Sequence, residues 1–467
     1  MINENRYFDA NPEVRKIAFE LYSEVKGLPI YSPHGHVDPQ LFADNKPFPN
    51  PTELFIIPDH YIFRMLYSQG YSLESLGIPT QDGSAVEKDF RKIWQIFADN
   101  FYLFSGTPTG AWLSHEFAEV FGITEKLNGD NAQSIYDLMS EKLQLPEFLP
   151  RTLFDNFNIK VLSTTDGASD SLDSHRKIIQ SDWNGKVIPS FRPDAVVNIL
   201  ADNWRLEIEK LNSASGINIT DYKSFISAIE NRREYFIEMG AVATDQGVLS
   251  PYTHELLSSE ADAIFQRALG GTATTDDEAQ FVGNMLMEMA RMSSEDGLVM
   301  QIHPGVLRNH NQKIFNSFGL DKGGDIPIQT EFTKNLHELL SKYGNHSNFK
   351  VIVFTLDETS YVRELAPLAG HYPAMKLGPA WWFNDSIQGM RRFRQMTTET
   401  AGFYNTVGFN DDTRAFLSIP ARHDLARRVD CNFLAQQVSE HIIDIEDAHK
   451  LSYELANGLV KKAYNLK

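Results

Sequence analysis

The sequence predicts an α/β protein built on a single (β/α)8 barrel, the TIM-barrel fold, with a large and mostly helical insertion after the first strand. Short apolar runs bounded by Gly, Pro, Asp or Asn recur along the 467 residues, as expected of parallel strands that are buried on both faces. Amphipathic helical patterns alternate with these runs. Strict alternation favours a parallel sheet, which eight units can close into a barrel.

A doubly wound open sheet is the alternative fold, but its main sequence signal is missing. No G-x-G-x-x-G follows a predicted strand, and no G-x-x-x-x-G-K-[ST] occurs in the chain. We therefore expect one barrel domain over residues 1–467 and no nucleotide cofactor.

The N-terminal region is predicted to contain a helix, the first strand and then the insertion. Asn11 and Pro12 suit the cap and the first turn of a helix. The first strand follows and leads into His34 and His36. Residues 40–156 are rich in helical patterns, are broken by several prolines and are too long for an ordinary connection, so we interpret them as the insertion.

Seven further apolar runs are predicted as the remaining strands. They are residues 159–165, 186–192, 240–245, 298–303, 349–356, 375–381 and 406–412. Helices with recognisable starts lie between them. Asp221 precedes one helix, and Thr275 with Glu278 forms a capping box ahead of another.

Composition limits the class of partner and the location. Hydrophobic residues make up 42% of the chain, which is ample for a large core, and the net charge of -19 argues against nucleic acid or an anionic membrane as partners. The single cysteine, Cys431, excludes an intramolecular disulfide and fits a reducing compartment. No signal peptide and no membrane-spanning apolar run is apparent, so we expect a soluble cytoplasmic protein.

The first strand ends in a pair of histidines that can share a ligand. Side chains at positions i and i+2 of an extended chain point to the same face, so His34 and His36 can reach one point beyond the strand. Gly35 between them leaves the backbone room to bend. A lone His-X-His is more often a pair of turn or surface histidines, so further ligands must support a divalent metal site.

Those further ligands are expected at the other strand ends, where a barrel of this kind carries its chemistry. The residues there include Asp166, Arg192, Asp245, His303, Asp357, Trp381 and Asp412. Strands one and eight are neighbours in a closed barrel, so Asp412 can join the two histidines as a third ligand. Two histidines and one carboxylate with open positions suit Zn²⁺ and would accept Mn²⁺, Co²⁺ or Ni²⁺.

Several longer strings in the chain carry a family resemblance. They are His34-Gly35-His36, Asp59-His60-Tyr61, Ser190-Phe191-Arg192, Trp381-Trp382-Phe383-Asn384-Asp385, Asp412-Thr413-Arg414 and Arg422-His423-Asp424. With them the sequence resembles the uronate (glucuronate) isomerases of the amidohydrolase superfamily nearly from end to end. The resemblance implies a TIM barrel of the metal-dependent hydrolase type.

The resemblance also implies an activity, which is the isomerisation of aldose sugar acids to ketose sugar acids in hexuronate catabolism. Such an enzyme interconverts D-glucuronate with D-fructuronate, and D-galacturonate with D-tagaturonate, through a cis-enediol(ate). The implied catalytic residues are His60, Tyr61, Asp412 and Arg414. The implied substrate-binding residues are Arg192, Arg414, Asp245, His303 and Trp381. One divalent metal on His34, His36 and Asp412 completes the implied site.

Two features of this implied site concern proton transfer and substrate preference. His60 could lower the pKa of the Tyr61 phenol or relay its proton, and the group that removes the C2 proton stays open. Gln246 stands where the family pattern leads us to expect histidine, and Asp357 where it leads us to expect asparagine. We expect both departures at the rim of the site, where they would affect the preferred uronate. A homo-oligomer is also expected.

Two other functions remain open at this stage. The first is a single-metal hydrolase of the same barrel type, acting on an anionic ester, lactone or amide. A two-metal hydrolase is disfavoured, because the strand ending at Asp245 offers no lysine to bridge two metals. The second is a non-catalytic protein that binds sugar acids.

Overall fold

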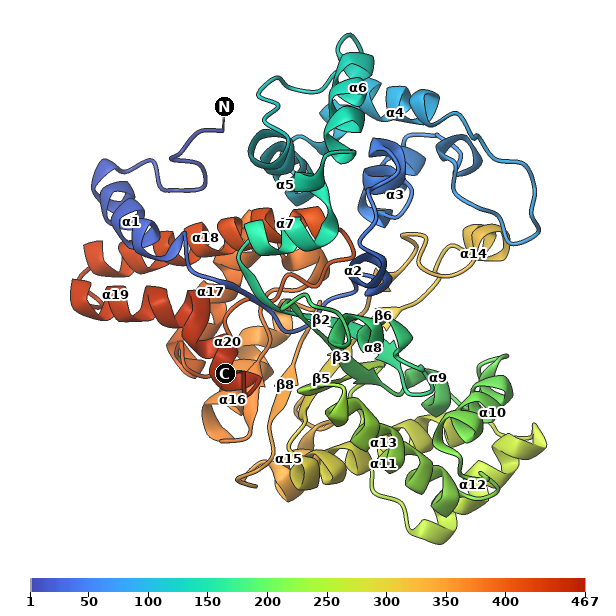
Figure 1. Ribbon diagram of the computed structural model, residues 1–467. Coiled ribbons are helices and arrows are strands. Elements are labelled where there is room, and N and C mark those ends of the chain that lie inside the picture. Colours follow the sequence, from blue (N-terminus) through green and yellow to red (C-terminus); the bar gives the residue numbers. More distant parts are fainter. Residues whose placement is uncertain (1, 467) are drawn as a thin grey trace.

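A strongly curled parallel sheet lies at the centre of the computed structural model, which describes residues 2–466 (Figure 1). The sheet has the strand order β1-β2-β3-β4-β5-β8-β9, and every neighbouring pair is parallel. Its strands are β1 Ile30–Ser32, β2 Ile159–Gly167, β3 Lys186–Arg192, β4 Ala243–Val248, β5 Val299–Pro304, β8 Val351–Val353 and β9 Met375–Leu377. The predicted α/β class and parallel sheet are confirmed.

The predicted eighth strand, residues 406–412, is wrong as a strand. This segment makes one parallel bridge, between Thr406 and Leu377 of β9, and has no ladder with β1. Gly408 and Asp412 have φ angles of 80° and 40°, in the left-handed region, so the extended conformation of the backbone is interrupted at both positions. The carbonyl of Thr413 nevertheless accepts a hydrogen bond of 3.0 Å from the His36 amide beyond β1.

Two other strands are shorter than predicted, and one strand starts later. The runs predicted at 349–356 and 375–381 form strands of only three residues each, β8 and β9. The run predicted at 240–245 forms β4 at Ala243–Val248, so Asp245 lies within the strand and not at its end.

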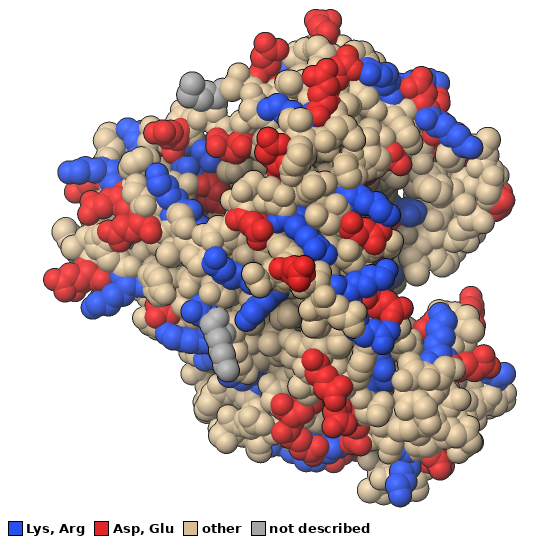
Figure 2. Space-filling view, viewed as in Figure 1, with Lys and Arg blue, Asp and Glu red and all other residues tan. Residues whose placement is uncertain are grey.

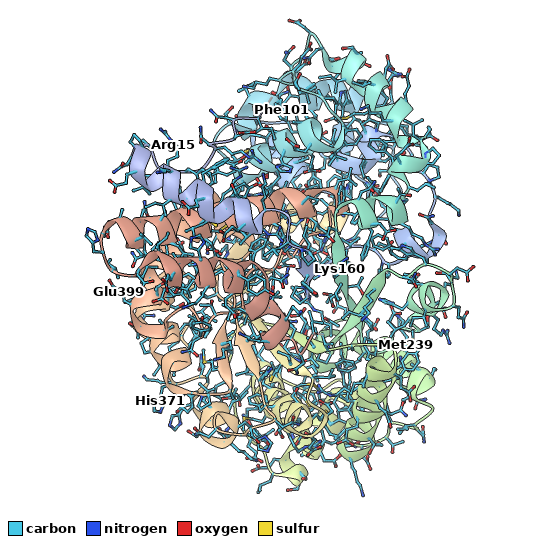
Figure 3. All side chains as sticks on the ribbon, turned by 60° about the vertical axis from the view of Figure 1, so that its left-hand side comes forward. Arg15, Phe101, Lys160, Met239, His371 and Glu399 are labelled. Carbon is cyan, nitrogen blue, oxygen red and sulfur yellow. The ribbon has the colours of Figure 1, made fainter. Side chains whose placement is uncertain are left out.

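The segment between β1 and β2 is mostly helical, as predicted. Its α-helices are α2 Gln40–Asp44, α3 His60–Ser68, α4 Phe90–Asp99, α5 Pro108–His115, α6 Ala132–Leu143 and α7 Pro150–Asn156. They lie above the sheet in Figure 1, and Figure 3 shows the same from a second direction, with Phe101 high above Lys160 of β2. Their apolar core runs on into the sheet, since Ile30, Ile159 and Leu162 belong to the same buried cluster.

The remaining helices pack around the outside of the sheet. They are α1 Pro12–Val25, α8 Asp173–Ile179, α9 Asp194–Val197, α10 Trp204–Ser215, α11 Tyr222–Glu238, α12 Ser258–Gly270, α13 Thr275–Asp296, α15 His337–Tyr343, α16 Ala366–His371, α17 Ile387–Ala401, α18 Ile419–Ser439, α19 Ile445–Tyr453 and α20 Leu459–Ala463. Asn11 and Asp221 cap α1 and α11 as predicted. The capping box of α13 is formed by Thr274 and Asp277, one residue earlier than predicted.

A two-stranded antiparallel ribbon stands apart from the main sheet. Its strands are β6 Val306–Leu307 and β7 Ile326–Pro327, and the short helix α14 Gln312–Phe318 lies in the loop between them. In Figure 1 this loop reaches up from the sheet to the side of the helical insertion. The loop that follows β5 therefore approaches the insertion that follows β1, at the carboxyl end of the strands.

Charges of both signs are interspersed over the face drawn in Figure 2. A hollow opens at the right of this view, between the insertion above and α10 and α12 below. Among residues 2–466, no helix combines the length and the apolar character needed to cross a membrane.

Candidate active site

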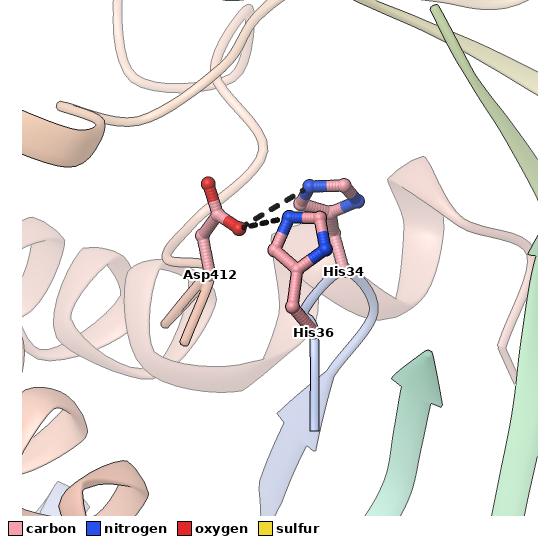
Figure 4. A group of neighbouring side chains, drawn as sticks. All are labelled: His34, His36 and Asp412. Carbon is pink, nitrogen blue, oxygen red and sulfur yellow. Dashed lines mark ion pairs between the residues drawn. The ribbon is translucent and has the colours of Figure 1, made fainter. Parts of the chain in front are cut away.

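The two histidines beyond β1 meet the predicted aspartate at one point (Figure 4). Nε2 of His34 lies 3.4 Å from Oδ1 of Asp412, and Nε2 of His36 lies 3.1 Å from the same oxygen. His34 is buried, and this carboxylate oxygen is buried without a hydrogen-bond partner. Convergence of two imidazole nitrogens on one unpaired carboxylate oxygen fits a divalent metal, so this group could bind one.

The other oxygen of Asp412 is held by the wall of the site. Nε1 of Trp381 donates a hydrogen bond to Oδ2 of Asp412. Trp381 is predicted as a substrate-binding residue, and its indole N–H is directed at the carboxylate of Asp412. A donor of this kind fixes the orientation of a carboxylate that ligates a metal.

A second group of ionisable residues adjoins the first. Nδ1 of His303 lies 2.6 Å from Oδ1 of Asp245, and the His303 ring stacks on His34 with 4.6 Å between ring centroids. Nε2 of His303 is buried without a partner. His34, Asp245 and His303 also come close enough together to form an alternative set of three metal ligands. Sequence reasoning placed Asp245 and His303 in the site without detecting this second set.

Two arginines reach the site from different strand ends. Arg192 at the end of β3 pairs with Oδ2 of Asp245 at 3.1 Å and with Asp194 at 2.7 Å. Burial opposes ionisation of Asp245, but Arg192 and His303 outweigh it, so the pKa of Asp245 lies well below its ordinary value. Arg414 is more exposed and pairs at 2.8 Å with Asp321 in the loop between β6 and β7.

His60 and Tyr61 enter the site from the start of α3, which Asp59 caps. Their rings stack with 4.7 Å between centroids, and Nε2 of His60 is buried without a partner. Burial, followed by the charge of Arg414, lowers the pKa of His60 to about 3, so the imidazole is neutral near pH 7. Burial also raises the pKa of Tyr61 well above its ordinary value. A lowered pKa for Tyr61 was one of the two expectations, and it is wrong.

Sequence reasoning assigned no role to three further residues of the site. Arg422 on α18 lies flat on the Trp112 indole, with Cζ 3.5 Å from the ring centroid, and Nη1 donates to Oδ2 of Asp385 at 2.7 Å. Burial raises the pKa of Asp385 to about 7. Asp385 and Arg422 belong to the family strings, but neither stands at a strand end, and Trp112 lies on α5 of the insertion.

One cavity of about 570 Å³ unites these groups. All the predicted catalytic, substrate-binding and metal-binding residues line it: His34, His36, His60, Tyr61, Arg192, Asp245, His303, Trp381, Asp412 and Arg414. Glu116 and Arg422 line it as well. Its volume is in the range of sites for small molecules. Neither Gln246 nor Asp357 lines the cavity, so the two departures do not lie at its rim as expected.

Glu116 makes the stability of the folded protein depend on pH in a way that can be tested. Burial raises its pKa to about 8 from 4.5, and the charge of Arg422 offsets only part of this. Between pH 4.5 and pH 8 the folded protein therefore keeps the proton on Glu116, while the unfolded chain loses it. The stabilisation that comes from protonated Glu116 is full below pH 4.5 and is lost as the pH rises through 8.

We expect the Glu116→Gln variant to lack this loss. Between pH 5 and pH 8, the free energy of unfolding should fall in the wild type by a few kcal/mol more than in the variant, at ~1.4 kcal/mol per pKa unit. Urea unfolding at both pH values measures the difference. Glu119→Gln, an exposed change in the same turn, is the matched control. Equal pH dependence in Glu116→Gln and wild type would contradict the raised pKa.

The fold and the site together define an α/β protein with a candidate metal centre at the carboxyl edge of a curled parallel sheet. Comparison with known proteins identifies the family more closely. The sequence model of the glucuronate isomerase family matches residues 6–461. A uronate isomerase of Nostoc punctiforme is 54% identical over all of this chain and 98% of its own length.

Solved structures agree with the sequence comparison. The glucuronate isomerase of Caulobacter crescentus has a TM-score of 0.98 and 51% identity, over all of this chain and 97% of that chain. The uronate isomerase of Thermotoga maritima has a TM-score of 0.93 and 27% identity, over 99% of both chains. This chain therefore belongs to the glucuronate isomerase family.

Proposed function

We propose that this protein is a uronate isomerase that interconverts D-glucuronate with D-fructuronate, and D-galacturonate with D-tagaturonate, through a cis-enediol(ate). The observation that carries the proposal is that every group the reaction requires lines one cavity. The reaction needs proton carriers, a means to stabilise the enediolate and a grip on the carboxylate. The named activity of full-length relatives at more than 50% identity supports the same assignment.

His34, His36 and Asp412 would hold a divalent metal, with Trp381 orienting the carboxylate. When bound, such an ion supplies a Lewis acid that polarises and orients substrate oxygens. Zinc, with manganese, cobalt or nickel as substitutes, stays a prediction, as do the homo-oligomer and the cytoplasmic location.

The remaining roles fall to side chains with the matching charge. Arg192 and Arg414 supply guanidinium groups for the substrate carboxylate and the developing oxyanion. Asp321, which pairs with Arg414, occupies a place that an anionic substrate can take. Asp245 and His303 bind hydroxyl groups and keep His34 in position.

Tyr61 and Asp412 are our proposed proton carriers between C2 and C1. The raised pKa of Tyr61 keeps the phenol protonated at neutral pH, which suits a donor to the enediolate. The neutral His60 ring stacked beside it can relay that proton, since its Nε2 has no partner in the described protein.

The architecture proposed around this site is a single closed (β/α)8 barrel over residues 1–467, with residues 40–156 as an insertion. The segment around Thr406 takes the eighth position, because it bridges to β9 on one side and Thr413 bonds to His36 on the other. One apolar cluster shared by the insertion and the sheet supports a single domain.

The first test is proton NMR of the purified protein with D-glucuronate, and then with D-galacturonate, in D₂O. We expect the keto acid to appear with deuterium at the exchanged carbon, because an enediol releases the C2 proton. Keto acid without deuterium would retain the isomerase and indicate either a shielded proton or a hydride shift. No product from either sugar, in protein shown to carry metal, would overturn the proposal.

The single-metal hydrolase is the second candidate function. An anion-binding pair of arginines beside a one-metal site would also suit an anionic ester or lactone. Release of acid from such a substrate, without isomerisation of either uronate, would favour it. A non-catalytic binding protein would bind the uronates saturably without exchanging the C2 proton.

A further inference from the structure

Arg422 is an arginine of the cavity wall whose hydrogen-bonding capacity is only partly used. Its residue is 2% exposed. Nε donates to Ser418 at 3.0 Å, and Nη1 donates to Asp385 at 2.7 Å and to the carbonyl of Asp411 at 3.2 Å. Within residues 2–466, Nη2 has no acceptor, and it is not among the fully buried polar atoms. Its two N–H groups are therefore available to a ligand in the cavity that Arg422 lines.

The surroundings of Arg422 place its guanidinium close to the proposed proton carriers, Tyr61 and Asp412. The guanidinium lies 5.9 Å from the Tyr61 ring centroid, on the side where Trp112 meets Tyr61 edge to face. The carbonyl that Nη1 contacts belongs to Asp411, directly before Asp412. Arg422 thus connects the two elements that carry the proposed proton carriers. Arg192 and Arg414 pair with other carboxylates of the site.

The guanidinium of Arg422 is also held rigidly. The stack on Trp112 and three hydrogen bonds to separate partners leave the guanidinium one orientation. Asp385, which is 3% exposed, accepts the hydrogen bond from Nη1 and holds the guanidinium in place. A fixed and desolvated cation stabilises charge that develops in a transition state better than a mobile one at the surface.

We propose that Arg422, anchored by Asp385, is a third substrate-contacting arginine, whose Nη2 donates to an oxygen of the enediolate beside Tyr61. The inference rests on the proposed isomerase function. It adds Arg422 to Arg192 and Arg414, as the arginine that faces the charge forming beside Tyr61.

The test compares Arg422→Lys with the wild type and with Arg394→Lys. Arg394 is a matched control, because it is also buried and pairs with Asp430 on α18 through Nε and Nη2, away from the cavity. We expect Arg422→Lys to lower kcat by about 10²–10³-fold with KM changed less than threefold, because only transition-state contacts are lost. Arg394→Lys should change thermal stability and leave kcat within about threefold.

A binding measurement separates a substrate contact from a structural role. A uronate-like hydroxamate, whose two cis oxygens mimic the enediolate, should bind Arg422→Lys more weakly by the same factor as kcat falls. L-Gulonate, which keeps the carboxylate but has an alcohol at C1, should bind within about threefold of wild type. Equal weakening of both ligands, or no weakening of the hydroxamate, would overturn the proposal.

Asp385→Asn provides a second variant if Arg422→Lys does not fold. It keeps the guanidinium and replaces the carboxyl group that accepts from Nη1 with an amide, which anchors it less firmly, so kcat and hydroxamate affinity should fall together by about tenfold. Unchanged values for both would overturn the anchored-arginine proposal. Failure of the wild type itself to isomerise either uronate would instead overturn the proposed function.

Discussion

Replacing Asp412 with asparagine is expected to lower kcat for uronate isomerisation by at least about 10³-fold, the largest effect of any single change. The carboxylate faces both histidines through one oxygen and Trp381 through the other. Asparagine retains the shape but removes the negative charge that a divalent cation requires. A loss of several kcal/mol of metal-dependent stabilisation corresponds to a change of this size.

The measurement pairs kinetics with metal content determined by elemental analysis after dialysis. Metal content should fall together with kcat in Asp412→Asn. Asp357→Asn is the control, because Asp357 does not line the cavity and hydrogen-bonds Thr330 and Thr359 instead. It should retain both metal and rate. Wild-type kcat in a metal-free Asp412→Asn protein would contradict the proposed role of the metal centre.

Removing the Tyr61 hydroxyl is expected to produce the second-largest loss. In Tyr61→Phe the ring can still stack on His60 and meet Trp112, so the cavity should keep its shape. The variant loses a group that can donate and recover a proton, and kcat should fall by about 10²–10⁴-fold. KM should change little, because the carboxylate contacts of Arg192 and Arg414 remain.

Tyr67→Phe is the matched control, since Tyr67 lies on the same helix and does not line the cavity. Its kcat should equal that of the wild type. Exchange of the C2 proton with D₂O, measured without net isomerisation, then identifies the step. If exchange persists in Tyr61→Phe while keto acid formation stops, Tyr61 delivers the proton and another group removes it. An unchanged kcat would eliminate Tyr61 as a proton carrier.

The site residues could be predicted before the fold was known because they follow from strand ends and family strings. His34 and His36 share a face by the two-residue period of an extended chain, and Asp412 was inferred from the adjacency of the first and last barrel strands. That inference holds for the three side chains, which do meet. It holds even though residues 406–412 form one bridge and not a strand. Positive φ angles at Gly408 and Asp412 interrupt the strand that the apolar pattern predicts.

The sequence alone determined the alternation of strands and helices, the family strings and the residue types of the site. Each of these depends on local periodicity or on residue identity, which are written along the chain. Only the tertiary structure decided the hydrogen bond of Trp381 to Asp412, the burial that raises the pKa of Glu116 and Tyr61, and the pairing of Arg422 with Asp385. Desolvation and hydrogen-bond partners arise from segments far apart in sequence, and no local pattern records which of them will meet.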